Sequence, residues 1–157
     1  MDKTNIFYLK MASHYANQMS GCVKVKVGSC IVKNDSIVAF GSNRTMPNLC
    51  KHKGCLRVEK YGNNFKAHRN PDDCRAIHSE VDAIGNAVRN GVNLSGSTIY
   101  VTRYPCENCA RLIVTSGIKH VVYGRQQEIS RMSSSIFESA GVSCYSEKEY
   151  LEEDIVV

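Results

Sequence analysis

The chain has 157 residues, of which 43% are hydrophobic, and it carries a formal net charge of +5 at pH 7. This length suits one domain with a proper core, so we expect residues 1–157 to form a single domain. No apolar run approaches the roughly 20 residues of a membrane span, and the N-terminus lacks a signal-peptide pattern, so we expect neither a membrane helix nor secretion. The scattered basic residues suit an anionic small ligand and give no positive sign of nucleic-acid binding.

The chain contains eight cysteines. Without a secretion signal, this number indicates metal ligands or buried thiols in a reducing compartment rather than a disulfide framework. The cytoplasm is therefore the expected location.

The N-terminal part predicts a helix followed by a hairpin. Apolar side chains at helical spacing predict a helix over residues 5–19. Residues 23–32 alternate and then become continuously apolar, which predicts a strand entering a buried sheet. After a turn at residues 33–36, residues 37–41 return as the paired strand.

Regular patterning stops over residues 42–73, which form a cysteine-containing insertion. A loop of this length inside a compact domain is usually functional or held in place by something. Four residues in and beside it have the right chemistry for a structural zinc site, with His52 and Cys22 as competing ligands: Cys50, Cys55, His68 and Cys74. The alternative is a set of separate, half-buried thiols and exposed histidines.

A helix is expected next, with Asp73 as its N-cap and Asn90-Gly91 at its end. Apolar residues recur along it at steps of three and four, which predicts one buried face. These residues are Cys74, Ile77, Val81, Ile84 and Val88.

Strands and helices alternate through the rest of the chain. The predicted strands cover residues 98–102, 118–123 and 142–145, and the predicted helices cover residues 105–116 and 130–140. Strands separated by helices of this length imply crossover connections in a layered domain. We therefore predict an α/β fold, a three-layer α/β/α sandwich, and the early hairpin makes its central sheet mixed.

Two short motifs have the chemistry of a catalytic zinc site: His78-Ser79-Glu80, and Pro105-Cys106-Glu107-Asn108-Cys109. An H-x-E followed by P-C-x-x-C is the signature of zinc nucleobase deaminases. One imidazole and two thiolates would give zinc three protein ligands and leave a fourth position open, as in catalytic sites. Cysteines three residues apart point the same way on one helical turn, and Pro105 suits the first turn of that helix.

Glu80 would then be the acid/base group. Zinc lowers the pKa of bound water to about 7, and a neighbouring carboxylate could take its proton and pass it to the ring nitrogen. Residues two apart on a helix point in nearly opposite directions, so His78 and Glu80 can share a site only at the entrance of a helix. The alternative is a surface H-x-E beside a purely structural C-x-x-C, in a zinc-stabilised binding module without catalysis.

Over residues 5–145 the chain resembles the cytidine-deaminase superfamily, and most of all its deoxycytidylate (dCMP) deaminase branch. The segments that carry the resemblance are residues 27–32, 41–43, 78–84, 102–109 and 116–123. The resemblance implies zinc ligation by His78, Cys106 and Cys109. It also implies that Glu80 is the proton shuttle.

The same resemblance implies that Asn43 contacts the substrate nucleotide. The expected reaction is zinc-dependent hydrolysis of the cytosine ring of dCMP to dUMP and ammonia, in pyrimidine nucleotide metabolism. Part of that branch carries a second zinc in a cysteine-rich insertion, and such enzymes commonly form homo-oligomers. Free cytidine or deoxycytidine remains an alternative substrate. A base within nucleic acid is a further alternative, although the chain has no Trp to serve as a stacking platform.

The chain departs from the family pattern around these residues. Ser79 replaces the usual alanine, and Asp82 replaces an asparagine, which could alter the contacts around the ligand. Ser42 and Arg44 replace the glycine and tyrosine that usually flank Asn43. Arg44 could hold a phosphate, or it could simply lie on the surface.

Overall fold

The computed structural model describes residues 3–45, 54–62, 74–125 and 130–147. Within these ranges no helix is long and apolar enough to cross a membrane. The elements in chain order are α1 (Lys3–Met19), β1 (Gly28–Lys33), β2 (Ser36–Ser42), β3 (Arg44–Thr45), α2 (Leu56–Tyr61), β4 (Ala76–Ile77), α3 (Ser79–Arg89), β5 (Thr98–Arg103), α4 (Glu107–Thr115), β6 (His120–Arg125), α5 (Arg131–Ser139) and β7 (Ser143–Ser146).

Five strands form the central sheet in the order β2-β1-β5-β6-β7. Strand β1 pairs antiparallel with both β2 and β5, whereas β5, β6 and β7 run parallel. The parallel neighbours are joined through α4 and α5, because parallel strands need a crossover connection. The predicted mixed sheet is confirmed. Strands β3 and β4 form a separate antiparallel pair.

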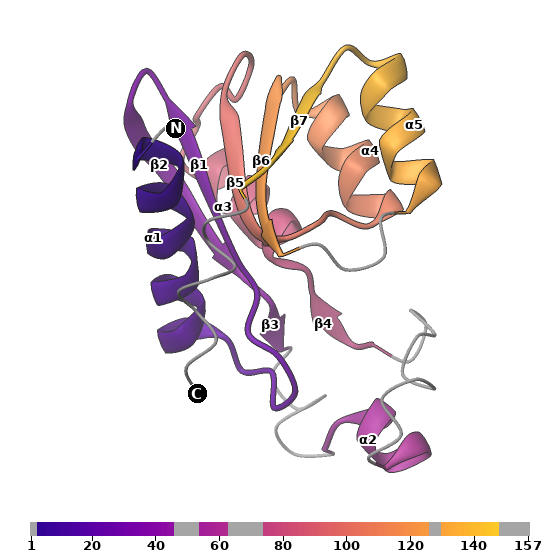
Figure 1. Cartoon of the computed structure of the whole chain (residues 1–157). Coiled ribbons are helices and arrows are strands. Elements are labelled where there is room, and N and C mark those ends of the chain that lie inside the picture. The colour runs from indigo at the N-terminus through magenta and orange to yellow at the C-terminus, as the bar shows by residue number, and fades with distance from the viewer. Residues whose placement is uncertain (1–2, 46–53, 63–73, 126–129, 148–157) are drawn as a thin grey trace.

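Helix α1 covers one face of the sheet, and α3, α4 and α5 lie on the other (Figure 1). This arrangement confirms the predicted three-layer α/β/α sandwich. The apolar cluster under α1 joins its buried face to the sheet, and it contains Tyr8, Leu9, Ala12, Cys30, Val32, Tyr100 and Val122.

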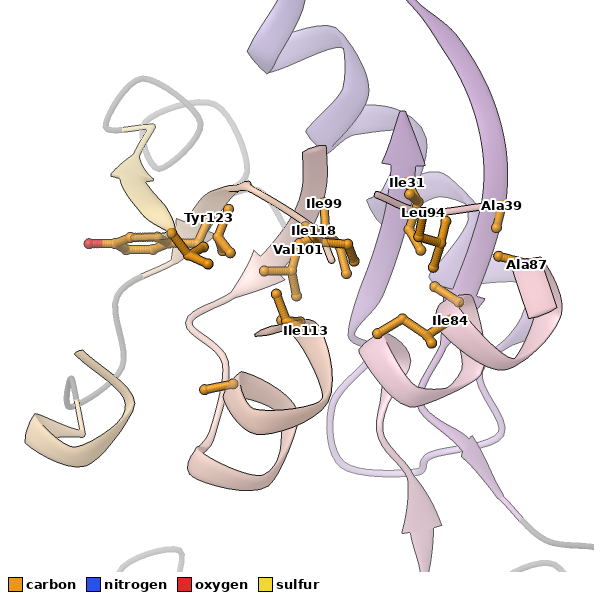
Figure 2. Close-up of a cluster of buried hydrophobic side chains, with 14 of the residues drawn as sticks. Ile31, Ala39, Ile84, Ala87, Leu94, Ile99, Val101, Ile113, Ile118 and Tyr123 are labelled. Atoms are coloured by element: carbon orange, nitrogen blue, oxygen red, sulfur yellow. The ribbon is translucent and has the colours of Figure 1, made fainter. Parts of the chain in front are cut away.

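A larger apolar cluster fills the space between the sheet and the helices on the opposite face (Figure 2). Its members include Ile31, Ile84, Ile99, Val101, Ile113, Ile118, Val121 and Phe137. Burying one such side chain contributes about 1.5–3 kcal/mol. The cluster therefore holds α3 and α4 firmly against the sheet, and with them the N-terminal ends of both helices.

The predicted hairpin is confirmed, but its first strand is shorter than expected. Asn34 and Asp35 both have positive φ, 50° and 58°, as a two-residue hairpin turn of type I′ requires. The strand begins at Gly28, and residues 23–27 are not part of it. A Cβ on Gly28 would lie 1.9 Å from the Ala12 carbonyl oxygen, so this strand starts where α1 packs too closely for any side chain.

The helix that carries the H-x-E motif begins later than predicted. It starts at Ser79, with His78 as its N-cap in extended conformation, and the preceding Ala76–Ile77 form β4. Asp73 lies outside the described residues. The helix ends with Asn90 as its C-cap and Gly91 at a φ of 68°, as expected.

The predicted buried face of this helix is wrong for two valines. Val81 and Val88 are 39% and 66% exposed, and the apolar contacts with the sheet come from Ala83, Ile84 and Ala87. The helix lies so close to β2 that a Cβ on Gly41 would be 2.1 Å from the Ser79 carbonyl oxygen. Small side chains suit that short distance better than valines do, so the helix turns its alanines inward.

The insertion contains more regular structure than its sequence predicts. Its described part includes β3 and the six-residue α2, which has no buried residue. Both elements lie beyond one end of the five-stranded sheet, where β3 pairs with β4 and α2 lies further out (Figure 1).

Candidate active site

His78 and Cys106 occupy equivalent positions, because each is the N-cap of a helix and has extended backbone. Cys109 and Glu80 lie in the first turns of α4 and α3. The prediction that the H-x-E motif lies at a helix entrance is therefore confirmed. Pro105 precedes the N-cap of α4 instead of lying in its first turn.

Three of the predicted ligands form one cluster. The ligand atoms of His78, Cys106 and Cys109 all lie within 4.8 Å of one another. Nδ1 of His78 is 3.5 Å from Sγ of Cys106 and 3.4 Å from Sγ of Cys109. Zinc–nitrogen and zinc–sulfur bonds of about 2.05 and 2.3 Å at a tetrahedral angle would set a nitrogen–sulfur separation of about 3.5–3.6 Å. The donors therefore fit a zinc ion in both chemistry and spacing.

The electrostatics of the cluster favour a thiolate at Cys106. A hydrogen bond from Cys109, assisted by His78, lowers the pKa of the Cys106 thiol to about 3. The pKa of Cys109 is raised because its proton is shared with Cys106 and because it is buried. The hydrogen bond to Cys106 in turn raises the pKa of His78. These shifts favour a thiolate beside two further ligand atoms, which suits a bound cation.

The Glu80 carboxylate faces the same site from a buried position. The residue is 5% exposed, and burial raises its pKa. Ser79 Oγ donates a hydrogen bond to Glu80 Oε2 at 3.1 Å. Ser29 in β1 lies 2.7 Å from that same hydroxyl. Sequence reasoning missed Ser29, because only the packing of α3 on β1 brings it near a residue 50 positions away.

A cavity of about 250 Å³ opens onto these groups. Its lining includes His78, Ser79, Glu80 and Cys106, together with Asn43, Val25, Val27, Tyr104, Lys24, Arg57 and Arg103. The last three are basic residues that come from a loop, from α2 and from the end of β5. No sequence motif marked them, because they are separated in the chain and meet only at this cavity.

Asn43 lies in the cavity wall, and it also holds that wall together. Its Oδ1 accepts hydrogen bonds from the Val27 N–H at 2.9 Å and from Ser20 Oγ at 2.5 Å. Its Nδ2 donates to the Val25 carbonyl at 2.7 Å. Asn43 thus anchors the segment that supplies Val25 and Val27 to the cavity.

The two charged departures from the family pattern contact each other. Arg44 Nη2 lies 3.2 Å from Asp82 Oδ1, and the Ser42 N–H donates to Asp82 Oδ2 at 3.1 Å. Asp82 therefore binds both residues that flank Asn43. Neither charged group is part of the cavity lining, so the contacts of Asp82 reach the backbone on either side of Asn43 but not the cavity itself.

The second predicted zinc site is only partly covered by the described residues. Cys22, Cys55 and Cys74 line one narrow pocket of about 30 Å³ beside the main cavity. Cys50 and His68 lie outside the described residues, as does the competing ligand His52. Within the described ranges, the His78 cluster is the group of three or more ligands that has metal-binding spacing.

A family model named for the zinc-binding region of cytidine and deoxycytidylate deaminases matches residues 2–125. The chain belongs to the cytidine and deoxycytidylate deaminase family. This membership agrees with the zinc fit of the His–Cys–Cys cluster, and it supports a zinc-dependent hydrolytic deaminase.

Several curated members of this family are similar to the chain. ComE operon protein 2 of Bacillus subtilis (strain 168) is 34% identical over 152 residues, which cover 95% of this chain and 73% of that protein. Deoxycytidylate deaminase of Saccharomyces cerevisiae is 32% identical over 139 residues, which cover 87% of this chain. The match spans 42% of the yeast enzyme, so that relative is much longer.

Solved deaminase structures share the fold. The dCMP deaminase of cyanophage S-TIM5, in complex with dCMP and dUMP, superposes with a TM-score of 0.73 at 26% sequence identity. The match covers 94% of this chain and 99% of the phage enzyme. A structure from studies of tRNA:A34 deaminases matches with a TM-score of 0.56 at 21% identity, which shows a common fold alone.

Proposed function

We propose that this protein catalyses the hydrolytic deamination of the cytosine ring of dCMP, which consumes water and gives dUMP and ammonia. The observation that carries the proposal is that one cavity joins a His–Cys–Cys cluster, a buried carboxylate and three basic side chains. Relatives named deoxycytidylate deaminase, and the S-TIM5 enzyme solved with dCMP and dUMP, support this substrate.

The chemistry divides between the metal and Glu80. A zinc ion held by His78, Cys106 and Cys109 supplies a Lewis acid that lowers the pKa of water to about 7. Glu80 takes a proton from the attacking water, delivers it to the ring nitrogen and later assists the departure of ammonia. Its burial suits this exchange, because burial raises the pKa of the carboxyl group and so favours acceptance of a proton from water.

The basic lining favours a nucleotide over a nucleoside. Lys24, Arg57 and Arg103 give the cavity a positive wall that suits a phosphate group. Hydrogen bonds between charged groups contribute about 1.5–3 kcal/mol each, so their loss should weaken phosphate binding strongly. Asn43 would donate the second hydrogen of Nδ2 to the nucleotide, since the first hydrogen binds the Val25 carbonyl.

The test of the reaction is a substrate panel of dCMP, CMP, deoxycytidine, cytidine and adenosine in RNA, with zinc content measured on the same sample. We expect the highest kcat/KM for dCMP. Glu80→Gln should keep its fold and zinc but lose about 10²–10⁴-fold in kcat. Glu107→Gln, an exposed first-turn glutamate of α4, is the matched control. Wild-type turnover in the Glu80 variant would refute the mechanism.

The test of the substrate compares phosphorylated and unphosphorylated forms. Arg57→Gln and Lys24→Gln should each raise KM for dCMP at least tenfold, by the magnitude of a charged hydrogen bond, and leave kcat/KM for deoxycytidine nearly unchanged. Arg89→Gln, at the exposed C-terminal end of α3, is the charge control. Equal losses on both substrates would contradict a phosphate role for these side chains.

We also propose a homo-oligomer in the cytoplasm. The exposed Val81 and Val88 on α3 support association, because apolar side chains that cluster on one helix face commonly meet a partner. The seven described cysteines are all free, which suits a reducing compartment. Molar mass from light scattering tests the first statement, and fractionation of the native cell tests the second.

A further inference from the structure

Two buried serine hydroxyls form a chain that ends on the Glu80 carboxylate. Ser29 is 0% exposed and Ser79 is 1% exposed, so both side chains are buried. Their Oγ atoms lie 2.7 Å apart, and Ser79 Oγ lies 3.1 Å from Glu80 Oε2.

The direction of these bonds follows from the number of protons available. A carboxylate only accepts hydrogen bonds, so Ser79 must use its single hydroxyl proton to donate to Glu80 Oε2. Ser79 then accepts from Ser29, which donates. Hydrogen bonds aligned in this way strengthen one another, particularly where the surroundings exclude water.

We propose that Ser79, supported by Ser29, is a positioning residue that fixes the orientation of the Glu80 carboxylate for proton transfer. The Ser79 hydrogen bond holds the carboxylate through Oε2 in one orientation, in which it can take a proton from water and return it to the ring. This inference rests on the proposed function of Glu80 as the proton shuttle.

Removal of the Ser79 hydroxyl would release this constraint. The carboxylate could then rotate, and only a fraction of its orientations would direct it at the reacting atoms. Misplacement of a catalytic group lowers the rate of the chemical step without changing how the substrate is bound. The effect should therefore appear in kcat, whereas a general loss of structure would lower the amount of active, zinc-loaded protein.

The experiment uses the zinc-loaded full chain with dCMP and three variants: Ser79→Ala, Ser29→Ala and the double variant. Ser79→Ala should lower kcat about tenfold, the size of one hydrogen bond to a charged group, with KM within about twofold of wild type. Ser29→Ala should lower kcat about threefold, because it removes only the support for Ser79. The double variant should match Ser79→Ala, because Ser29 acts only through Ser79.

Ser97→Ala is the matched control, since Ser97 is 1% exposed and donates to the Leu94 carbonyl at 2.6 Å, away from the cavity. This variant should lose stability but keep kcat. The inference is overturned if Ser79→Ala keeps kcat within about twofold of wild type, or if the two single effects multiply in the double variant. If Ser79→Ala does not fold, an unchanged kcat in Ser29→Ala overturns it. Wild-type activity in Glu80→Gln would instead overturn the proposed function itself.

Discussion

Replacement of Asn43 by alanine tests whether this residue holds the cavity wall as well as facing the substrate. The change removes the hydrogen bonds to the Val27 N–H and the Val25 carbonyl. Ser20 keeps a hydrogen bond in this variant, because its hydroxyl also donates to the backbone carbonyl of residue 43 at 3.0 Å. Two lost bonds at about 1 kcal/mol each predict a decrease of about 2 kcal/mol in the free energy of unfolding.

Urea denaturation of the zinc-loaded protein measures this decrease, and a separate thermal unfolding experiment measures the melting temperature. For a chain of this length the expected decrease in melting temperature is about 4–8 °C. KM for dCMP should rise in parallel, because Val25 and Val27 both line the cavity. Asn93→Ala is the control: its side chain accepts one exposed bond from the Ser95 N–H, so its removal should change stability by less than about 0.5 kcal/mol.

Unfolding of Asn43→Ala at the wild-type urea concentration, together with a raised KM, would contradict the anchoring role of Asn43. In that case Asn43 would contact the substrate without anchoring the loop. An unchanged KM with reduced stability would assign it an anchoring role alone.

Three further predictions concern the metal and the charged pair. Chelation should abolish activity and lower the melting temperature, and added Zn²⁺ should restore both, whereas activity after measured removal of zinc would contradict a metal role. Arg44→Ala should decrease the free energy of unfolding by about 1 kcal/mol, because the Asp82 carboxylate loses its ion pair and keeps the hydrogen bond from the Ser42 N–H. An equal decrease in Arg89→Ala would show that the effect is not specific to this pair. The second zinc site predicted from the sequence includes Cys55, so Cys55→Ser should lower the zinc content from two ions per chain towards one; a single ion per wild-type chain would refute this site.

Much of the fold was predictable because its signals are local. Helix α1, the β1–β2 hairpin and the alternation from β5 to β7 all follow from apolar spacing and from turn residues such as Asn34 and Gly91. The predicted start of α3 was wrong because apolar spacing continues backwards through Cys74 and Ile77, whereas the pairing of β4 with β3 holds that segment extended. The spacing of apolar residues within one segment carries no information about a strand that pairs with it from elsewhere in the chain.

The His78–Cys106–Cys109 cluster and the nearby Glu80 could be predicted from the chain alone, because their chemistry depends on residue type and on short spacings such as Cys106 to Cys109. Contacts between distant segments were decided only by tertiary packing. The approach of Ser29 to Ser79, the pairing of Arg44 with Asp82 and the common cavity of three basic residues all arise where α3 and the insertion meet the sheet. No sequence motif marks these contacts, since the distance between the residues in space is set by the helix-to-sheet packing and not by their separation along the sequence.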